Sequence, residues 1–139
     1  MLIVNNKIEL KTKGNTDIVD ITDQIKKVFN EAELNKGLCT IFVPGATGAL
    51  TTLEFEPGVV RDIKDALEKV APMEGFYSHN TKWGDENGVA HVRAALMKPD
   101  LSIPFSAGEL TLGTWQQIVF IDFDVRARDR EIMVQFIGV

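Results

Sequence analysis

The sequence predicts an α+β fold, in which mainly antiparallel β-sheets pack with two helices. Two segments repeat apolar side chains at helical spacing, and the remainder alternates apolar and polar side chains or forms short apolar runs, as strands do. The strands predicted in the second half of the chain follow one another through short turns. Such connections are typical of antiparallel pairing and argue against a doubly wound parallel sheet.

Length and composition indicate one domain spanning residues 1–139. Hydrophobic residues make up 45% of the chain, charged residues make up 25%, and the net charge is −5. These values fit a folded protein better than a disordered one. The longest uncharged stretch, residues 37–53, is interrupted by Pro44 and several glycines, so it does not predict a membrane-spanning helix. The acidic balance and the scattered basic residues argue against nucleic acid and favour small molecules as ligands.

The N-terminus and the cysteine content bear on location. The first residues lack the basic region, apolar block and small-residue cleavage site of a secretory signal, so we expect a cytoplasmic protein without a membrane partner. Cys39 is the only cysteine, which excludes a disulfide or a cysteine-based zinc cluster within one chain.

The first half of the chain is predicted to begin with strands and a helix. Residues 2–12 alternate in part and predict strand material around a turn at Asn5-Asn6. From Asp20 the apolar residues follow helical spacing, with Asp20 or Thr22 as the cap and Gly37 as the stop.

Two short strands and the second helix follow. Residues 39–43 and 50–55 are predicted strands, because they are apolar or rich in β-branched threonine. The second helix is expected to begin at Pro57 and to end before Pro72. Glu54 and Glu56 precede it, where the helix dipole favours a negative charge.

The second half is predicted to be entirely β. Residues 89–97 alternate, which would place Val89, His91 and Arg93 on the same face of a strand. Three further strands are expected at residues 109–112, 115–124 and 130–137, with turns at Gly113 and at residues 126–129. Residues 115–124 carry apolar side chains on both parities, with Trp115, Val119, Ile121 and Phe123 on one face and Ile118 and Phe120 on the other. We therefore expect both faces of that strand to be buried.

A polar segment at residues 77–88 leads into the predicted strand of His91. It carries His79 and Asp85, which the loop could bring towards His91 and Arg93. Two imidazoles and a carboxylate could hold a divalent metal, or the histidines could act as acid and base. The alternative is structural: His79 and Asp85 shape a turn, and His91 is a hydrogen-bonded side chain in a half-buried strand.

The loop at residues 44–52 offers glycines and hydroxyl groups after a predicted strand. Its amides could face an anion, although a plain turn explains the Pro44-Gly45 pair equally directly. The loop is not a Walker motif, because the lysine is absent and a strand is expected to follow.

Several segments together resemble the YjbQ family, which is described as a family of secondary thiamine-phosphate synthases. The resemblance implies an α+β fold with two helices and a homotrimer. The segments that carry it, in chain order, are the Pro44-to-Thr52 loop with Glu54 and Pro57, Tyr77–Asn80, Asp85–Gly88, Ala90–Ala94, Ile103–Phe105 before Gly108, and Leu112–Gln117.

The resemblance also implies an activity and a site. The reaction joins a hydroxymethylpyrimidine diphosphate to a thiazole phosphate with loss of diphosphate, and magnesium is a candidate cofactor. The implied catalytic residues are His79, Asp85 and His91. The implied substrate-binding residues are Arg93, Thr114, Trp115 and Gln116, of which Arg93 would stabilise the leaving diphosphate and Trp115 would stack on the pyrimidine.

Two departures from the family pattern favour a second hypothesis. Many relatives carry histidine at the positions of Gly45 and Val89, so this chain offers at most two imidazoles to a metal. The expected positive charge of Arg93 beside His91 would favour an anion over zinc. The alternative function is therefore a non-catalytic protein that binds a phosphorylated metabolite or an anion in a cleft between subunits.

Overall fold

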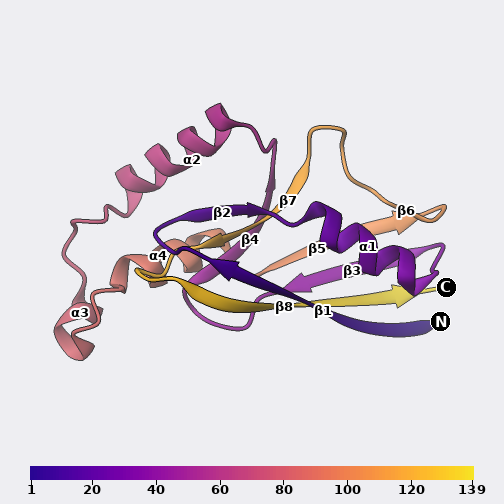
Figure 1. Ribbon diagram of the computed structural model, residues 1–139, viewed down its shortest axis with the longest axis horizontal. Coiled ribbons are helices and arrows are strands. Elements are labelled where there is room, and N and C mark those ends of the chain that lie inside the picture. The colour runs from indigo at the N-terminus through magenta and orange to yellow at the C-terminus, as the bar shows by residue number, and fades with distance from the viewer.

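Figure 1 shows the fold in a computed structural model of the protein, which describes residues 1–139 except the side chain of Trp83. The strands are β1 (Leu2–Thr12), β2 (Asp17–Asp20), β3 (Gly37–Phe42), β4 (Gly48–Leu53), β5 (Asp100–Ser106), β6 (Glu109–Leu110), β7 (Gln117–Asp122) and β8 (Arg128–Gly138). The helices are α1 (Thr22–Ala32), α2 (Pro57–Val70), α3 (Ser78–Trp83) and α4 (Gly88–Met97).

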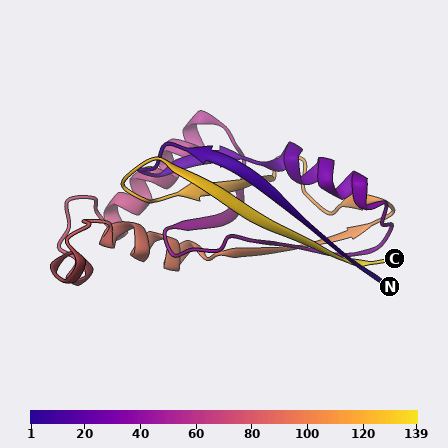
Figure 2. The same ribbon diagram turned by 60° about the horizontal axis from the view of Figure 1, so that its bottom comes forward.

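The strands form two antiparallel sheets, which confirms the predicted α+β class. One sheet has the order β1-β8-β3-β5-β6 and the other has the order β2-β7-β4. Most pairs join distant parts of the chain: β1 pairs with β8 from Leu2 opposite Gly138 to Thr12 opposite Arg128. The two termini therefore lie together at one end of the molecule, opposite α3 (Figures 1 and 2).

The first core fills the space between the inner face of the five-stranded sheet, α1 and one face of the three-stranded sheet. Phe29 of α1, Phe105 of β5 and Phe136 of β8 meet there, with ring centroids 4.9 to 6.3 Å apart. Cys39 lies in the same core, where burial raises the pKa of its thiol to about 12. The thiol therefore stays protonated and is a poor nucleophile.

The second core lies on the other face of the three-stranded sheet, under α2 and α4. It contains Leu67 of α2, Ala90 and Ala94 of α4, and Val119 and Ile121 of β7. Ile118 and Phe120 of β7 point into the first core instead. The prediction that both faces of this strand are buried is confirmed, and the chain's own elements cover both. Trp115 lies before β7 and is exposed, so its expected place on the apolar face is wrong.

The two predicted helices are confirmed, and local contacts fix where each begins. The Asp20 carboxylate accepts hydrogen bonds from the backbone N–H and the hydroxyl of Thr22, at 2.9 and 2.6 Å, at the start of α1. The Glu56 carboxylate caps α2 by accepting from the N–H groups of Gly58 and Val59, at 2.8 and 2.5 Å. These contacts satisfy donors that the first turn of a helix leaves without partners.

The predicted strand at residues 89–97 is wrong, because this segment is helix α4. Its buried residues include Val89, Ala90, Arg93 and Ala94, which follow the spacing of one helical face. Apolar residues occupy both parities of the segment, so alternation could not distinguish the two structures, and its alanines favour a helix.

Other differences are local. The expected turn at Asn5-Asn6 does not form, since β1 is continuous through it. Residues 78–83 form α3 instead of a loop, and β2 and β5 were not predicted. The remaining strands occur where expected, with shifted ends. No helix among the described residues is long and apolar enough to cross a membrane.

Candidate functional site

Helix α4 sends His91 and Arg93 in different directions, because side chains two residues apart lie on nearly opposite sides of a helix. The side chain of Arg93 is 4% exposed. It donates from Nε to the carbonyl of Ala71, from Nη1 to Oγ1 of Thr16 and from Nη2 to Oε2 of Glu68, at 2.9, 2.8 and 2.9 Å. The expectation that Arg93 shares a face with His91 and receives an anion there is therefore wrong. Arg93 is a structural tie between α4, α2 and the segment before β2.

The structure does bring His79, Asp85 and His91 together. His79 lies on α3 and His91 on α4, with ring centroids 4.4 Å apart. Nε2 of His79 lies 3.2 Å from Oδ1 of Asp85, an ion pair when His79 is protonated. The Asn87 side-chain amide turns its nitrogen towards Asp85 Oδ1 at 3.0 Å, because the opposite orientation would set its oxygen against that carboxylate.

A close junction between α3 and α4 holds this group in place. The Asn80 side chain accepts a hydrogen bond from the N–H of Gly88 at 2.9 Å. A Cβ atom at Gly88 would lie 2.5 Å from Cβ of Tyr77, so only glycine permits this approach. The junction fixes the start of α4 and hence the position of His91.

His91 opens onto a hollow of about 300 Å³ beside the loop between β3 and β4. Gly45, Ala46 and Gly48 of that loop form one side, and Ala94 and Ala95 of α4 join His91 on the other. The volume is at the lower end of the range for ligand pockets. An imidazole at the wall of a small, largely apolar hollow can exchange a proton with a ligand or donate a hydrogen bond to it.

On the other side of the same loop lies a buried network that the sequence analysis missed. Asp122 and Asp124 at the end of β7 are almost completely buried. Arg130 binds Asp122 through Nε and Nη2, each at 2.8 Å, and Arg128 binds Asp124 through Nε at 2.9 Å. The Thr47 hydroxyl accepts from Nη2 of Arg130 at 2.8 Å and lies 3.2 Å from Asp124 Oδ2, which anchors the loop to the network.

These partners control the protonation of the two carboxyl groups. Burial alone would raise the pKa of Asp122, but hydrogen bonds from Arg130 and Thr12 more than offset burial and hold that pKa below its usual value. The pKa of Asp124 is lowered in the same way, with Arg128 as its main partner. The hydrogen bond with Asp122 raises the pKa of Arg130. The sequence did contain a signal, since two carboxylates at the end of an apolar strand must be paired to be buried.

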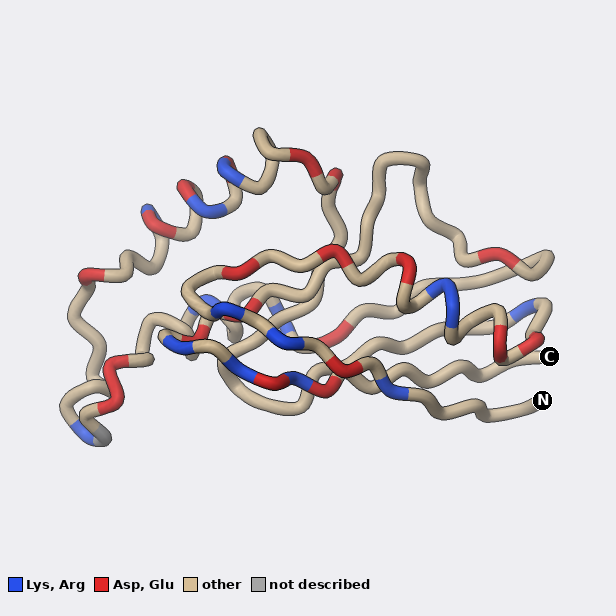
Figure 3. The backbone as a smooth tube through the Cα atoms, in the orientation of Figure 1, with Lys and Arg blue, Asp and Glu red and all other residues tan. Residues whose placement is uncertain are grey.

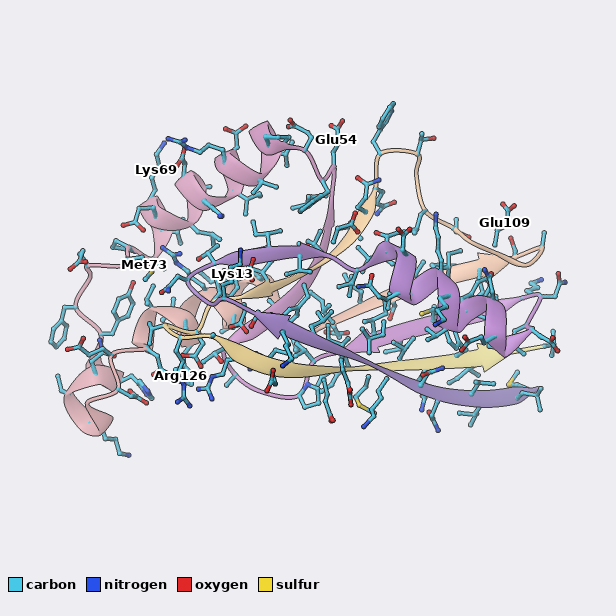
Figure 4. All side chains as sticks on the ribbon, viewed as in Figure 1. Lys13, Glu54, Lys69, Met73, Glu109 and Arg126 are labelled. Carbon is cyan, nitrogen blue, oxygen red and sulfur yellow. The ribbon has the colours of Figure 1, made fainter. Side chains whose placement is uncertain are left out.

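The remaining predicted residues lie elsewhere in the chain. Thr114, Trp115 and Gln116 belong to the loop between β6 and β7, which lies away from α3 and α4 in Figure 1. In Figure 4, Glu109 of β6 is labelled at the right of the view, whereas α3 and α4 lie at the left. Gln116 donates to Oγ1 of Thr52 at 3.0 Å and lines a separate hollow of about 440 Å³ with Thr114. Within one chain, these residues therefore do not share a site with His91.

Comparison with known proteins identifies the family. The family model described as "UPF0047 protein YjbQ-like" matches residues 6–139. The chain belongs to this YjbQ family. A UPF0047 protein of Archaeoglobus fulgidus is 36% identical over 129 residues, which cover 93% of this chain and 98% of the relative.

Solved structures of YjbQ-like proteins share the fold. One is a protein of unknown function from Sulfolobus solfataricus, with a TM-score of 0.94 and 29% identity, covering 99% of both chains. Another is an uncharacterised protein of the YjbQ family from Clostridium acetobutylicum, with a TM-score of 0.85 and 37% identity, covering 95% of this chain and 99% of the other.

The side chains of this YjbQ-family protein do not fit a metal held by the protein alone. Among the described residues, no three His, Cys, Asp or Glu side chains are grouped to bind one ion. Val89 is buried in α4, so the expectation that it shares a face with His91 is wrong. Gly45, in contrast, lines the same hollow as His91. Of the two departures from the family pattern, only Gly45 therefore changes the surroundings of His91.

Proposed function

We propose that this protein is a transferase of the thiamine-phosphate synthase type with weak or secondary activity. The ring nitrogen of a thiazole phosphate would form a bond to the methylene carbon of a hydroxymethylpyrimidine diphosphate. The carbon–oxygen bond to diphosphate would break, and the diphosphate would leave with the bonding electrons. The observation that carries the proposal is the imidazole of His91 at a hollow beside a glycine-containing loop, with the imidazole of His79 next to it.

The imidazoles supply what the reaction needs most, stabilisation of the negative charge on the leaving diphosphate. A protonated His91 can donate a charge-assisted hydrogen bond to it or transfer a proton to it. Oδ1 of Asp85 lies 3.2 Å from Nε2 of His79 and holds that ring in place beside His91. His91 is therefore assigned the contact with substrate, and His79 and Asp85 position and polarise it.

Substrate binding by Thr114, Trp115 and Gln116 would require a second copy of the chain, since these residues lie away from His91 in one chain. The proposal therefore includes a homotrimer in which this loop of one copy approaches the hollow of the next. Magnesium would enter with the diphosphate of the substrate, and we derive no step from a metal held by the protein.

The test is an assay of purified protein with both phosphorylated precursors and magnesium chloride, measuring thiamine phosphate and released diphosphate. His91→Ala should lower the rate by about 100-fold or more, because acid–base and charge-stabilising groups contribute on that order. Leu96→Ala, an exposed change on the same helix, is the matched control and should leave the rate unchanged. An equal rate for His91→Ala and the unmodified protein would refute the assigned site.

The alternative function is non-catalytic binding of a phosphorylated metabolite or an anion in a cleft between subunits. It is supported by the small size of the hollow and by Gly45, which leaves room where many relatives carry a side chain. Calorimetric titration with thiamine phosphate and simple phosphates separates the two functions. Tight binding without turnover would favour the binding protein, and failure to bind any of these compounds would reject it.

A further inference from the structure

We propose that the space beside Gly45 is a binding site for a phosphoryl group, with Arg130 as its principal cation. The phosphoryl group would contact Nη1 of Arg130, the backbone amides of Gly45 and Ala46, and His91. The inference rests on the proposed function in one respect: it identifies where the diphosphate of such a substrate would bind.

The Arg130 guanidinium has one nitrogen left for a ligand. Nε and Nη2 are bound by Asp122, and Nη2 also donates to Thr47. Among the described residues, Nη1 has no hydrogen-bond acceptor. Because two of its nitrogens are clamped, the guanidinium presents Nη1 in a fixed direction, and such a donor loses little entropy when it binds an anion.

Gly45 leaves the space that Nη1 faces. Its φ of +124° lies in the region that favours glycine. If a Cβ atom is placed on Gly45, the one heavy atom found within 4 Å, apart from its chain neighbours, is Nη1 of Arg130, at 3.5 Å. A ligand atom in place of that side chain would therefore lie within contact distance of an arginine nitrogen.

The loop backbone and His91 complete the site. The flanking amides are paired, Val43 N–H with the carbonyl of Pro99 at 3.0 Å and Leu50 N–H with the carbonyl of Lys98 at 3.1 Å. The N–H groups of Gly45 and Ala46 donate to no acceptor among the described residues. Gly45 and Ala46 also line the hollow with His91. Arg130 lines a different hollow with Pro44, and its Nη1 reaches the space at Gly45 from that side. Gly45 therefore lies between the imidazole and the guanidinium. Concave sets of such donors bind phosphate.

The neighbouring negative charges do not oppose an anion strongly. Asp122 and Asp124 are neutralised by their arginines. Asp129 and Glu131 flank Arg130 on β8 and border the same hollow of about 830 Å³. They are exposed, whereas Arg130 is half-buried, because side chains alternate along a strand. Figure 3 shows acidic and basic residues alternating along β1 and β8.

The test is calorimetric titration of the purified protein with pyrophosphate. Arg130→Lys retains the net charge but cannot present Nη1, so affinity should fall about 10- to 100-fold. His91→Gln should weaken binding about tenfold. Arg126→Lys, an exposed change on the neighbouring turn, is the matched control and should bind like the unmodified protein. Circular dichroism establishes that each variant is folded.

If Arg130→Lys does not fold, amide chemical shifts of the unmodified protein decide the question. Pyrophosphate should shift the amide signals of Gly45 and Ala46. Shifts confined to another region, no binding by the unmodified protein, or unchanged affinity in both Arg130→Lys and His91→Gln would overturn the inference. Binding at this site without thiamine phosphate formation would refute the proposed reaction and leave the site standing. Product formation with pyrophosphate bound elsewhere would do the reverse.

Discussion

Arg93, which is buried, and Arg130, which is half-buried, differ in the hydrogen bonds that they have left for a ligand. Arg93 donates from Nε, Nη1 and Nη2 to three protein acceptors, whereas Nη1 of Arg130 has no acceptor among the residues that the structure describes. The sequence drew attention to Arg93 because it stands two residues from His91, a spacing that matters on a strand and not on the helix that forms. The sequence did not indicate Arg130, because its pairing with Asp122 depends on the positions of β7 and β8 in the fold.

The first prediction at this scale concerns Arg93. Arg93→Ala should lower the free energy of unfolding by about 2–4 kcal/mol, because it leaves Thr16 and the Ala71 carbonyl without their donor and removes the pair with Glu68. Pyrophosphate affinity of the folded variant should be unchanged. Urea unfolding measures the first effect, with the exposed Arg61→Ala as the control. A variant that is fully stable but binds pyrophosphate more weakly would restore Arg93 to the site.

The second prediction concerns the pH dependence of stability. The pKa values of Asp122 and Asp124 are lowered in the folded state, so their stabilising contribution is complete above the unfolded value of about 3.9 and is lost as pH falls through the folded value. Asp122→Asn should lower the free energy of unfolding by about 3–5 kcal/mol near neutral pH, because it leaves Arg130 unpaired. On acidification, this variant should lose less stability than the unmodified protein does.

Urea unfolding at about pH 6 and about pH 3 measures this effect. Asp129→Asn, an exposed change on β8 next to Arg130, should follow the unmodified protein at both pH values. If Asp122→Asn lost as much stability on acidification as the unmodified protein, Asp122 would not be one of the groups responsible.

At the scale of single elements, the periodicity of the sequence predicted the two helices that have one apolar face and failed for α4. Helices α1 and α2 have clear caps, a clear stop and a single apolar face, so their positions were predictable. The segment of α4 is apolar on both parities, so strand and helix templates fit it equally. That error placed Arg93 and Val89 beside His91. The predicted proximity of His79, Asp85 and His91 was nevertheless correct, because the residues before α4 pack closely against it.

The matched pair Glu54 and Glu56 tests the account of α2. Glu56→Ala should destabilise the protein by about 1 kcal/mol, since the Glu56 carboxylate accepts from the N–H groups of Gly58 and Val59. Glu54→Ala should change stability by less than about 0.5 kcal/mol, because it removes a surface charge without removing the cap. Thermal and urea unfolding of both variants provide the comparison, and equal effects would show that overall charge, not capping, stabilises this end of α2.

At the scale of the whole molecule, the pairing of strands from opposite ends of the chain could not be predicted from local patterns. That pairing also creates an apolar patch on the outer face of the five-stranded sheet. Ile3 and Leu38 both lie beside Ile137, Phe42 lies beside Met133, and all five side chains are at least 36% exposed. Such a patch is typical of a surface that another protein covers. This patch supports the proposed homotrimer. Strand β7 does not, because both of its faces are already buried within one chain.

Light scattering at micromolar concentration tests the assembly. We expect a mass three times the 15.4 kDa of one chain. Met133→Asp should shift the mass towards one chain, because it places a charge in the patch. Val70→Asp, at an exposed apolar position on α2, is the control and should leave the mass unchanged. A monomer mass for the unmodified protein would contradict the homotrimer.

The central claim is that the loop at Gly45, Arg130 and His91 together form the site where a phosphorylated ligand binds. The most direct measurement is a crystal structure of the protein grown with pyrophosphate. The account predicts pyrophosphate beside Gly45, within hydrogen-bond distance of Nη1 of Arg130 and of the His91 imidazole. Pyrophosphate bound instead in the hollow lined by Thr114 and Gln116, with the space beside Gly45 filled by water, would contradict it.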